Sequence, residues 1–198
     1  MHVGMSVIFQ NPGERVPDQQ VYQQDLALAL QAEGLGFDSV WSVEHHFTSY
    51  TMCPDVLQFL TYMAGATKSI QLGSMVCVLP WHDPLRVIEQ ISMLDNLSDG
   101  RLILGLGRGT GKVEFDGFRS EMSSARQRFK ESTEMVLNAI ENGYAEYHGD
   151  VIEQPRVDIR PRPIKSMRGR AYAAAVSPDS ARIMAEMGVG ILIVPQKP

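Results

Sequence analysis

The sequence predicts an α/β fold in which strands and helices alternate along the chain. Six short, nearly continuous apolar runs are typical of strands in a parallel sheet that is covered on both faces. Amphipathic stretches with helical spacing separate most of these runs, as in successive βα units. The predicted strands are Val3–Phe9, Phe37–Val43, Ile70–Leu79, Leu102–Leu106, Ala171–Val176 and Ile191–Val194.

Helix signals lie between the strands. Asp83 and Ser177 are good N-caps, and each is followed by a proline that suits the first helical turn. Glycines 34, 143 and 188 are stop signals. The predicted helices are Asp18–Glu33, Pro54–Thr67, a segment opening at Asp83-Pro84, Ser123–Asn142 and a segment opening at Ser177-Pro178. The third of these helices is expected to turn five apolar side chains inward: Leu85, Ile88, Ile91, Leu94 and Leu97.

Two architectures satisfy right-handed βα alternation: a doubly wound open sheet and a (β/α)8 barrel. The residue pattern alone leaves both open. A whole barrel takes about 250 residues, so a barrel of 198 residues would stop after about the sixth strand. Residues 144–170 interrupt the alternation with several prolines and a basic run. We predict an inserted hairpin and loop there, with the basic side chains on a solvated face.

Composition excludes several classes of protein. The apolar runs are too short to cross a bilayer, and the N-terminal residues lack the basic and long apolar regions of a secretory signal. The two cysteines, Cys53 and Cys77, make no disulfide framework, which fits a reducing cytosol. A net charge of −5 argues against nucleic acid or an anionic membrane as the main partner. We expect a cytoplasmic globular protein.

The segment Glu44-His45-His46-Phe47 directly follows the second predicted strand. Ligands of parallel α/β folds bind at the carboxyl ends of the strands, so this cluster is a candidate catalytic site. Neighbouring residues in extended backbone point to opposite sides, and one of the two histidines should therefore face the site while the other packs away. A carboxylate beside an imidazole can poise it for proton transfer. A pair of structural histidines is the alternative.

A metal site is a rival interpretation of the same residues. Two histidines and a carboxylate can begin a zinc or iron site, and His82 after the third strand is a further donor. Neighbours in sequence rarely bind one ion together, and the first strand ends in Phe9-Gln10, which offers no ligand. We therefore expect no metal.

Two further segments have the composition of a phosphate site. In Gly105-Leu106-Gly107-Arg108-Gly109-Thr110-Gly111, glycines permit close approach of a flat ligand and Arg108 supplies a permanent positive charge. The dinucleotide fingerprint fails there, because Thr110 stands where glycine is required and no apolar helix begins at once. Ser177-Pro178-Asp179-Ser180 opens a helix whose amino end attracts anions. A flexible loop and plain capping explain these segments equally well.

Taken in order, these segments resemble the luciferase-like flavin monooxygenase family. Phe37-Asp38-Ser39-Val40-Trp41 followed by Glu44-His45-His46-Phe47-Thr48 resembles the second strand and loop of the bacterial luciferase α subunit. The resemblance continues through Val78-Leu79-Pro80, Leu97-Ser98-Asp99-Gly100-Arg101 and Pro161-Arg162-Pro163 to Ala185-Glu186-Met187-Gly188. It covers nearly the whole chain. It implies a TIM (β/α)8 barrel, incomplete over residues 1–198, that uses reduced FMN and O2 on a small organic substrate.

The resemblance also implies roles for particular residues. His45 matches the histidine that acts in proton transfer, with Glu44 as its neighbour near the flavin. Met75 and Val76 match a cis non-proline peptide under the flavin ring. Arg108, Ser177 and Ser180 match the phosphate contacts.

Two positions of the implied flavin site depart from the luciferase pattern. Gly107 replaces a cysteine beside the flavin, and Val176 replaces an acidic residue of the phosphate loop. We therefore expect no light emission. The sequence shows no nicotinamide site, so we expect a separate flavin reductase as the source of reduced FMN, and the resemblance to luciferase-like dimers implies a homodimer or heterodimer. The alternatives are a deazaflavin-dependent oxidoreductase of the same fold, a non-catalytic flavin-binding subunit and a metal-dependent barrel hydrolase.

Overall fold

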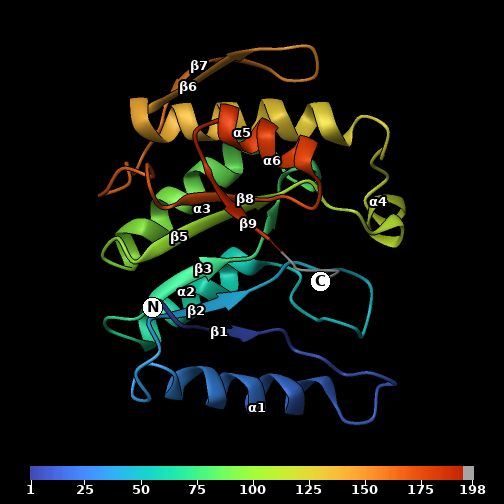
Figure 1. Ribbon diagram of the computed structural model, residues 1–198, viewed down its shortest axis with the longest axis vertical. Helices are drawn as coiled ribbons and strands as arrows, with labels where there is room; N and C mark the ends of the chain where they lie inside the picture. The colour runs from blue at the N-terminus through green and yellow to red at the C-terminus, as the bar shows by residue number, and fades with distance from the viewer. Residues whose placement is uncertain (194–198) are drawn as a thin grey trace.

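The structure, a computed structural model that describes residues 1–193, contains one parallel sheet whose strands follow chain order (Figure 1). A doubly wound sheet would reverse its strand order at a switch point, so the consecutive order is that of a barrel wall. The six strands of this path are β1 (Gly4–Val7), β2 (Ser39–Ser42), β3 (Gln71–Ser74), β5 (Leu102–Gly107), β8 (Ala171–Ala174) and β9 (Gly190–Leu192). Val194, the last residue of the sixth predicted strand, lies outside the described residues.

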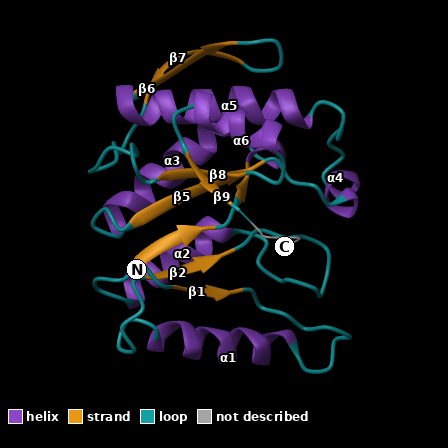
Figure 2. Cartoon of the chain, viewed as in Figure 1, coloured by secondary structure: helices purple, strands orange, loops and turns teal. Residues whose placement is uncertain are grey.

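Helices lie between successive strands of the path and pack against the sheet (Figure 2). The first turns of the helices that begin after Asp83 and Ser177 are capped as the sequence predicts. Asp83 accepts a hydrogen bond from the backbone N–H of Leu85, and Ser177 and Ser180 form a reciprocal capping box. The long helices are α1 (Asp18–Gln31), α2 (Val56–Ala66), α3 (Pro84–Leu97), α5 (Ala125–Asn142) and α6 (Pro178–Glu186).

The third predicted strand, Ile70–Leu79, is wrong as one continuous element. Strand β3 ends at Ser74, the Met75–Val76 peptide is cis, and a two-residue strand β4 (Cys77–Val78) leads into the 3-10 turn η1 (Leu79–Trp81). The hydroxyl of Ser74 bridges the interruption, since it donates to the carbonyl of Gly105 and accepts from its N–H, both at 2.8 Å. A Cβ at position 105 would lie 2.0 Å from the Ser74 carbonyl oxygen. Glycine is therefore required where the two strands close up.

Three smaller predictions also need correction. A short helix, α4 (Lys112–Gly117), does begin directly after the glycine-rich loop, because Phe115 packs edge-on against Trp81 and this contact compensates for the low intrinsic stability of so short a helix. Leu97 is 54% exposed rather than inward, since it lies at the end of α3. Strand β8 stops at Ala174, so Val176 stands beyond it and is 66% exposed.

Between α5 and β8 the chain forms the antiparallel hairpin of β6 (Tyr144–His148) and β7 (Glu153–Asp158), which lies over α5 (Figure 1). The turn between β6 and β7 is held by a side chain of α5. The buried Glu131 carboxylate of α5 accepts hydrogen bonds from the backbone N–H groups of residues 150–152. This arrangement matches the inserted hairpin expected between residues 144 and 170.

Both cysteines are buried and free. Burial raises the pKa of Cys53 to about 11 and that of Cys77 well above its ordinary value, so both behave as small apolar side chains rather than reactive thiols. Among the described residues, none of the helices combines the length and the apolar character needed to cross a bilayer.

Candidate active site

All strands of the parallel sheet point toward the same side of the molecule, where the loops after β2, β4, β5 and β8 gather (Figure 2). This is the end of an α/β sheet at which ligands bind. The segments singled out from the sequence all lie on these loops or at these strand ends: His45 follows β2, Met75–Val76 precedes β4, Arg108 follows β5 and Ser177 follows β8.

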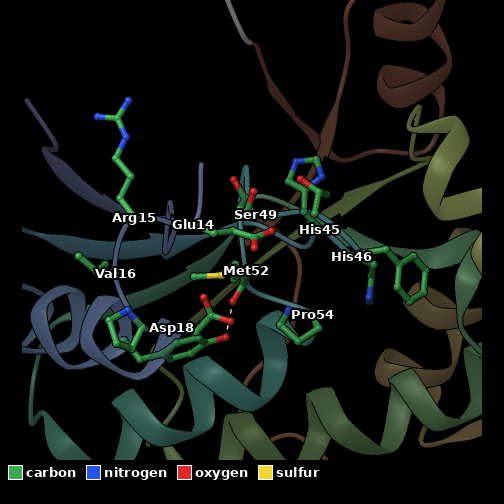
Figure 3. Close-up of a pocket in the computed structure, with 14 residues that line it drawn as sticks. Glu14, Arg15, Val16, Asp18, His45, His46, Ser49, Met52 and Pro54 are labelled. Atoms are coloured by element: carbon green, nitrogen blue, oxygen red, sulfur yellow. Dashed lines mark hydrogen bonds between the residues drawn. The ribbon is translucent and has the colours of Figure 1, made fainter. Parts of the chain in front are cut away.

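His45 and His46 leave the loop after β2 in different directions (Figure 3). The ring of His46 is buried, and the side chain of His45 is 38% exposed. The two side chains therefore differ in exposure, but both histidines line the pocket described below, and the separation of one site-facing histidine from one packed away stays a prediction. The Nδ1 atom of His45 lies 2.8 Å from Oε1 of Glu114, which comes from α4. Because a carboxylate accepts hydrogen bonds, this contact leaves Nε2 of His45 available to a ligand.

Glu44 does not contact the His45 ring, contrary to the expectation that this neighbouring carboxylate poises it. Its buried carboxylate takes hydrogen bonds from Nε2 of His46 at 3.0 Å, from Nε2 of His82 at 2.6 Å and from the backbone N–H of Val78 at 2.8 Å. Burial alone would raise the pKa of Glu44, but these bonds outweigh it and lower the pKa. Glu44 therefore ties the loop after β2 to β4 and the turn that follows.

The carboxylate that does hold His45 was not found from the sequence. Glu114 lies 69 positions away, on a helix of six residues that the sequence did not reveal. The one local signal is its position just after the glycine-rich loop of a neighbouring strand, where a side chain can reach the same end of the barrel. That signal indicates the part of the chain from which a side chain could reach the site, but it does not identify Glu114 as the partner of His45.

Glu44, Cys77 and His82 place one potential ligand atom each within 4.8 Å of one another. Two properties make this group a poor metal site. Burial raises the pKa of the Cys77 thiol, whereas a metal needs the thiolate. The Glu44 oxygens already accept three hydrogen bonds. The group is best described as a hydrogen-bond network between β2, β4 and His82.

The side chain of Val76, the second residue of the cis peptide, faces the strand that carries the glycines. A Cβ added to Gly107 would lie 2.2 Å from Cγ2 of Val76, and Val78 pairs with Gly107 in the ladder between β4 and β5. Glycine at 107 is thus required by the Val76 side chain. The glycines in the second half of β5 are explained by close packing of strands, an account that the sequence did not offer.

Arg108 and Ser177 follow neighbouring strands. Leu106 pairs with Ala173 in the parallel ladder of β5 and β8, so the chain segments that follow both strands emerge at one edge. Arg108 is half-buried. The Ser177 and Ser180 hydroxyls accept backbone hydrogen bonds from each other's residues at 3.2 and 3.0 Å. Both serines therefore hold the start of α6. No hydrogen bond or ion pair joins the Arg108 guanidinium to another group among residues 1–193, so its charge could meet a phosphate.

A pocket of about 860 Å³ opens beside His45 (Figure 3). Its walls are the segment that leads into α1 and the loop that leads from His45 to Pro54, and both acidic and hydroxyl side chains line it. The lining residues include Glu14, Arg15, Asp18, Tyr22, His45, Ser49, Thr51, Met52 and Pro54. Arg108, Ser177 and Ser180 lie outside this pocket, so the candidate acid–base residue and the candidate phosphate residues flank different parts of the barrel end.

Comparison with protein families finds one matching description, luciferase-like monooxygenase, over residues 1–198. The alkanal monooxygenase alpha chain of Photobacterium leiognathi is 31% identical over 93% of this chain and 51% of its own length. An uncharacterised protein of Sinorhizobium fredii, y4wF, is 34% identical over 87% and 51%. The oxygenase component of a flavin-dependent trigonelline monooxygenase from Acinetobacter baylyi is 28% identical over 92% and 52%. The chain thus spans about half the length of the curated relatives it matches.

Solved structures agree with this result. The monooxygenase RslO1 of Streptomyces bottropensis superposes with a TM-score of 0.91 at 31% identity, over 100% of this chain and 61% of that one. The oxygenating constituent of 3,6-diketocamphane monooxygenase from Pseudomonas putida, solved with FMN, gives 0.80 at 19% identity, over 98% and 57%. A secondary alcohol dehydrogenase dependent on coenzyme F420 gives 0.77 at 17%, over 97% and 57%. The last two show the fold alone, and the barrel architecture is confirmed.

Proposed function

The chain belongs to the luciferase-like monooxygenase family. From that premise we propose that it carries the flavin-binding part of a monooxygenase that uses reduced FMN and O2. One oxygen atom enters a small organic substrate, the other leaves as water, and FMNH2 is oxidised to FMN. The observation that carries the proposal is His45, held at Nδ1 by a buried carboxylate while the rest of its ring borders a pocket of about 860 Å³.

His45 is the proton-transfer residue in this proposal. An imidazole with one nitrogen engaged by a carboxylate and the other free can accept and return a proton at a fixed place. Bound reduced FMN supplies the electrons that activate O2. Glu44 does not touch the pocket, and its part is to hold His46 and His82 in place behind His45.

The cofactor-binding residues are proposed to be Met75, Val76, Gly107, Arg108, Val176, Ser177 and Ser180. The Val76 side chain packs over Gly107, where no Cβ intervenes, and together they offer a flat apolar surface for a ring system. The guanidinium of Arg108 supplies charge-assisted hydrogen bonds to a phosphate. The N-terminus of the nine-residue helix α6, organised by Ser177 and Ser180, adds the partial positive charge of its free N–H groups.

An anaerobic titration tests the proposal. The protein is titrated with reduced FMN and then mixed with oxygenated buffer while absorbance, hydrogen peroxide and oxygenated product are followed. We expect saturable binding of reduced FMN and, on oxygen addition, a transient absorbance distinct from that of oxidised FMN. No binding of reduced FMN at any concentration would contradict the proposal.

The same titration separates the alternatives. Tight binding of a reduced deazaflavin with no binding of FMN identifies the deazaflavin-dependent oxidoreductase, whose fold is shared by the alcohol dehydrogenase described above. Flavin binding without any oxygen-dependent step identifies a non-catalytic subunit. That alternative is favoured by one observation: within residues 1–193, β1 and β9 stand at the two ends of the strand order, each paired on one side.

The partners follow from the chemistry. The trigonelline enzyme is described as an oxygenase component, and by analogy we propose that a separate reductase supplies reduced FMN to this chain in the cytoplasm. A homodimer or heterodimer is the proposed assembly. Sedimentation of the purified chain alone and with a flavin reductase measures both associations.

A further inference from the structure

We propose that Glu114 is the positioning residue that holds His45 in a single tautomer, with the proton on Nδ1 and a bare Nε2 at the pocket. The inference rests on the proposed function, in which His45 moves a proton, and it adds a second residue to that step. Glu114 acts through His45 and lies behind it, away from the substrate.

The hydrogen bonds of Glu114 define the tautomer. Its Oε1 lies 2.8 Å from Nδ1 of His45 and 3.1 Å from the backbone nitrogen of His46. The backbone N–H can only donate, so Oε1 is an acceptor, and an ionised carboxylate remains an acceptor toward Nδ1 as well. The proton of a neutral His45 ring therefore sits on Nδ1, and Nε2 keeps its lone pair.

Burial of Glu114 strengthens its hydrogen bond to His45. The Glu114 side chain is 3% exposed, so water competes poorly for its oxygens and the bond to His45 is stronger than the same bond at the surface. The second oxygen, Oε2, occupies the space that a side chain at position 111 would need: a Cβ there would lie 1.9 Å from it. The glycine-rich loop thus makes room for the carboxylate that reaches His45.

The backbone around the pair is fixed from both sides. The N–H of His45 donates to the carbonyl of Cys53 at 3.0 Å, which holds the loop after β2. On the other side, Phe118, just after α4, packs edge-on against the His46 ring with centroids 4.6 Å apart. The loop and α4 therefore form one packed unit, and the His45 ring has little freedom to rotate away from Glu114.

Nitrogen-15 NMR of the histidine side chains, without any flavin, tests the proposal. In the wild-type chain we expect the neutral His45 ring to show a protonated Nδ1 and a bare Nε2, assigned by loss of its signals in His45→Asn. In Glu114→Leu, which removes the acceptor, the two tautomers should mix and turnover should fall at least 100-fold. Glu114→Gln keeps an oxygen of the same reach, so it should retain part of the Nδ1-protonated form and lose about 10-fold in turnover.

A matched surface pair serves as the control. His148 Nδ1 lies 2.7 Å from Oε1 of Glu153 in the hairpin, and both side chains are exposed. Glu153→Gln removes the same kind of carboxylate from a histidine outside the site. It should leave the His45 tautomer and turnover unchanged, which separates the effect of Glu114 from a general loss of charge.

Failure of the positioning role and failure of the proposed function give different results. A His45 tautomer that is unchanged in Glu114→Leu overturns the positioning role; if Glu114→Leu does not fold, as circular dichroism would show, Glu114→Ala removes the same acceptor, and an unchanged tautomer in that variant overturns the role. Failure of the proposed function looks different, because full turnover in His45→Ala would remove His45 from the reaction while the tautomer measurement stands.

Discussion

Carboxylates at the two ends of the barrel have different partners. At both ends they accept hydrogen bonds from backbone N–H groups, but histidine rings are partners of Glu44 and Glu114 at the carboxyl ends of the strands and not of Asp95 and Glu33 at the amino ends. Both groups include buried members, and both bring together segments far apart in the chain. The two groups differ in whether a partner of the carboxylate keeps an atom that can still bind a ligand.

At the amino end, the carboxylates Asp95 and Glu33 hold loop segments and border none of the pocket beside His45. Asp95, near the end of α3, accepts hydrogen bonds from the backbone N–H groups of Ile164 and Lys165 and from the guanidinium of Arg170. Glu33 accepts hydrogen bonds from the Ser69 hydroxyl and from the backbone N–H groups of residues 68–70 before β3, and these bonds lower its pKa to about 2. Carboxylates near helix C-termini oppose the helix dipole. The loop N–H groups that they satisfy offset this cost.

At the carboxyl end, no partner within residues 1–193 engages Nε2 of His45. Glu44 binds the buried His46 ring, the backbone N–H of Val78 and His82, which is 29% exposed but does not line the pocket, whereas Glu114 holds His45, whose half-exposed ring borders it. A buried carboxylate is thus a structural clamp when none of its partners is a half-exposed ring beside a pocket, and a candidate part of a reactive site when one partner is such a ring. Four predictions test this distinction.

The largest effect is expected from His45→Ala. Loss of a positioned proton-transfer group lowers turnover by about 10²–10⁴-fold, while binding of reduced FMN and the unfolding free energy stay close to wild type. Product formation and flavin titration are measured on the same preparation. Turnover equal to wild type would place His45 among the structural residues.

Asp95→Ala should show the opposite behaviour. It leaves the Arg170 charge, 2.7 Å away in the wild type, without its buried partner, so the unfolding free energy should fall by about 3–5 kcal/mol with flavin affinity of the folded fraction unchanged. Urea unfolding measures the loss. The exposed pair of Arg182 and Glu186 is the control: Glu186→Ala should cost about 0.5 kcal/mol or less. Equal losses in both variants would contradict the clamp.

Arg108→Ala is expected to weaken binding of reduced FMN by about 10-fold to 100-fold, the range for losing a hydrogen bond to a charged group. Arg108→Lys keeps the charge but loses the planar fork, and its loss should be smaller. Isothermal titration with FMN and with riboflavin, which lacks the phosphate, isolates the contact. An equal loss for both ligands would show that Arg108 does not meet the phosphate.

The smallest effect concerns the pH dependence contributed by Glu44 and His82. Burial lowers and Glu44 raises the pKa of His82, with a net rise above 6.5; the pKa of Glu44 falls below 4.5. A raised histidine pKa stabilises the fold below about pH 6.5 and loses that contribution as pH rises through the folded value. A lowered carboxylate pKa stabilises it above about pH 4.5 and loses that contribution as pH falls.

Glu44 and His82 therefore contribute their full stabilisation of the fold between about pH 4.5 and pH 6.5. Thermal melting of wild type and His82→Gln across pH 4 to 9 measures this contribution as the difference in Tm. The difference should be largest near pH 5 to 6 and should shrink toward alkaline pH. A difference that is flat across the range would show that the two groups do not titrate together.

The order of strands and helices could be predicted from the sequence because it depends on local patterns. Apolar runs, proline after a capping residue and terminal glycines gave elements within a few residues of the observed ones. That His45 and His46 take different directions was also predictable, since neighbours alternate in extended backbone, but both border the pocket. The break after Ser74 was not visible in the apolar pattern, because all of Ile70–Leu79 reads as one strand.

Within the site, local sequence determined which residues stand at the ends of strands, and therefore that His45, Arg108 and Ser177 would occupy one edge of the barrel. Tertiary structure alone decided which carboxylate meets which histidine. Glu44 is adjacent to His45 in sequence, but extended backbone turns neighbours apart, and Glu114 reaches the ring from 69 positions away because α4 folds back over the loop after β2. Periodicity fixes the face on which a side chain lies, whereas its partner on that face depends on how distant segments pack.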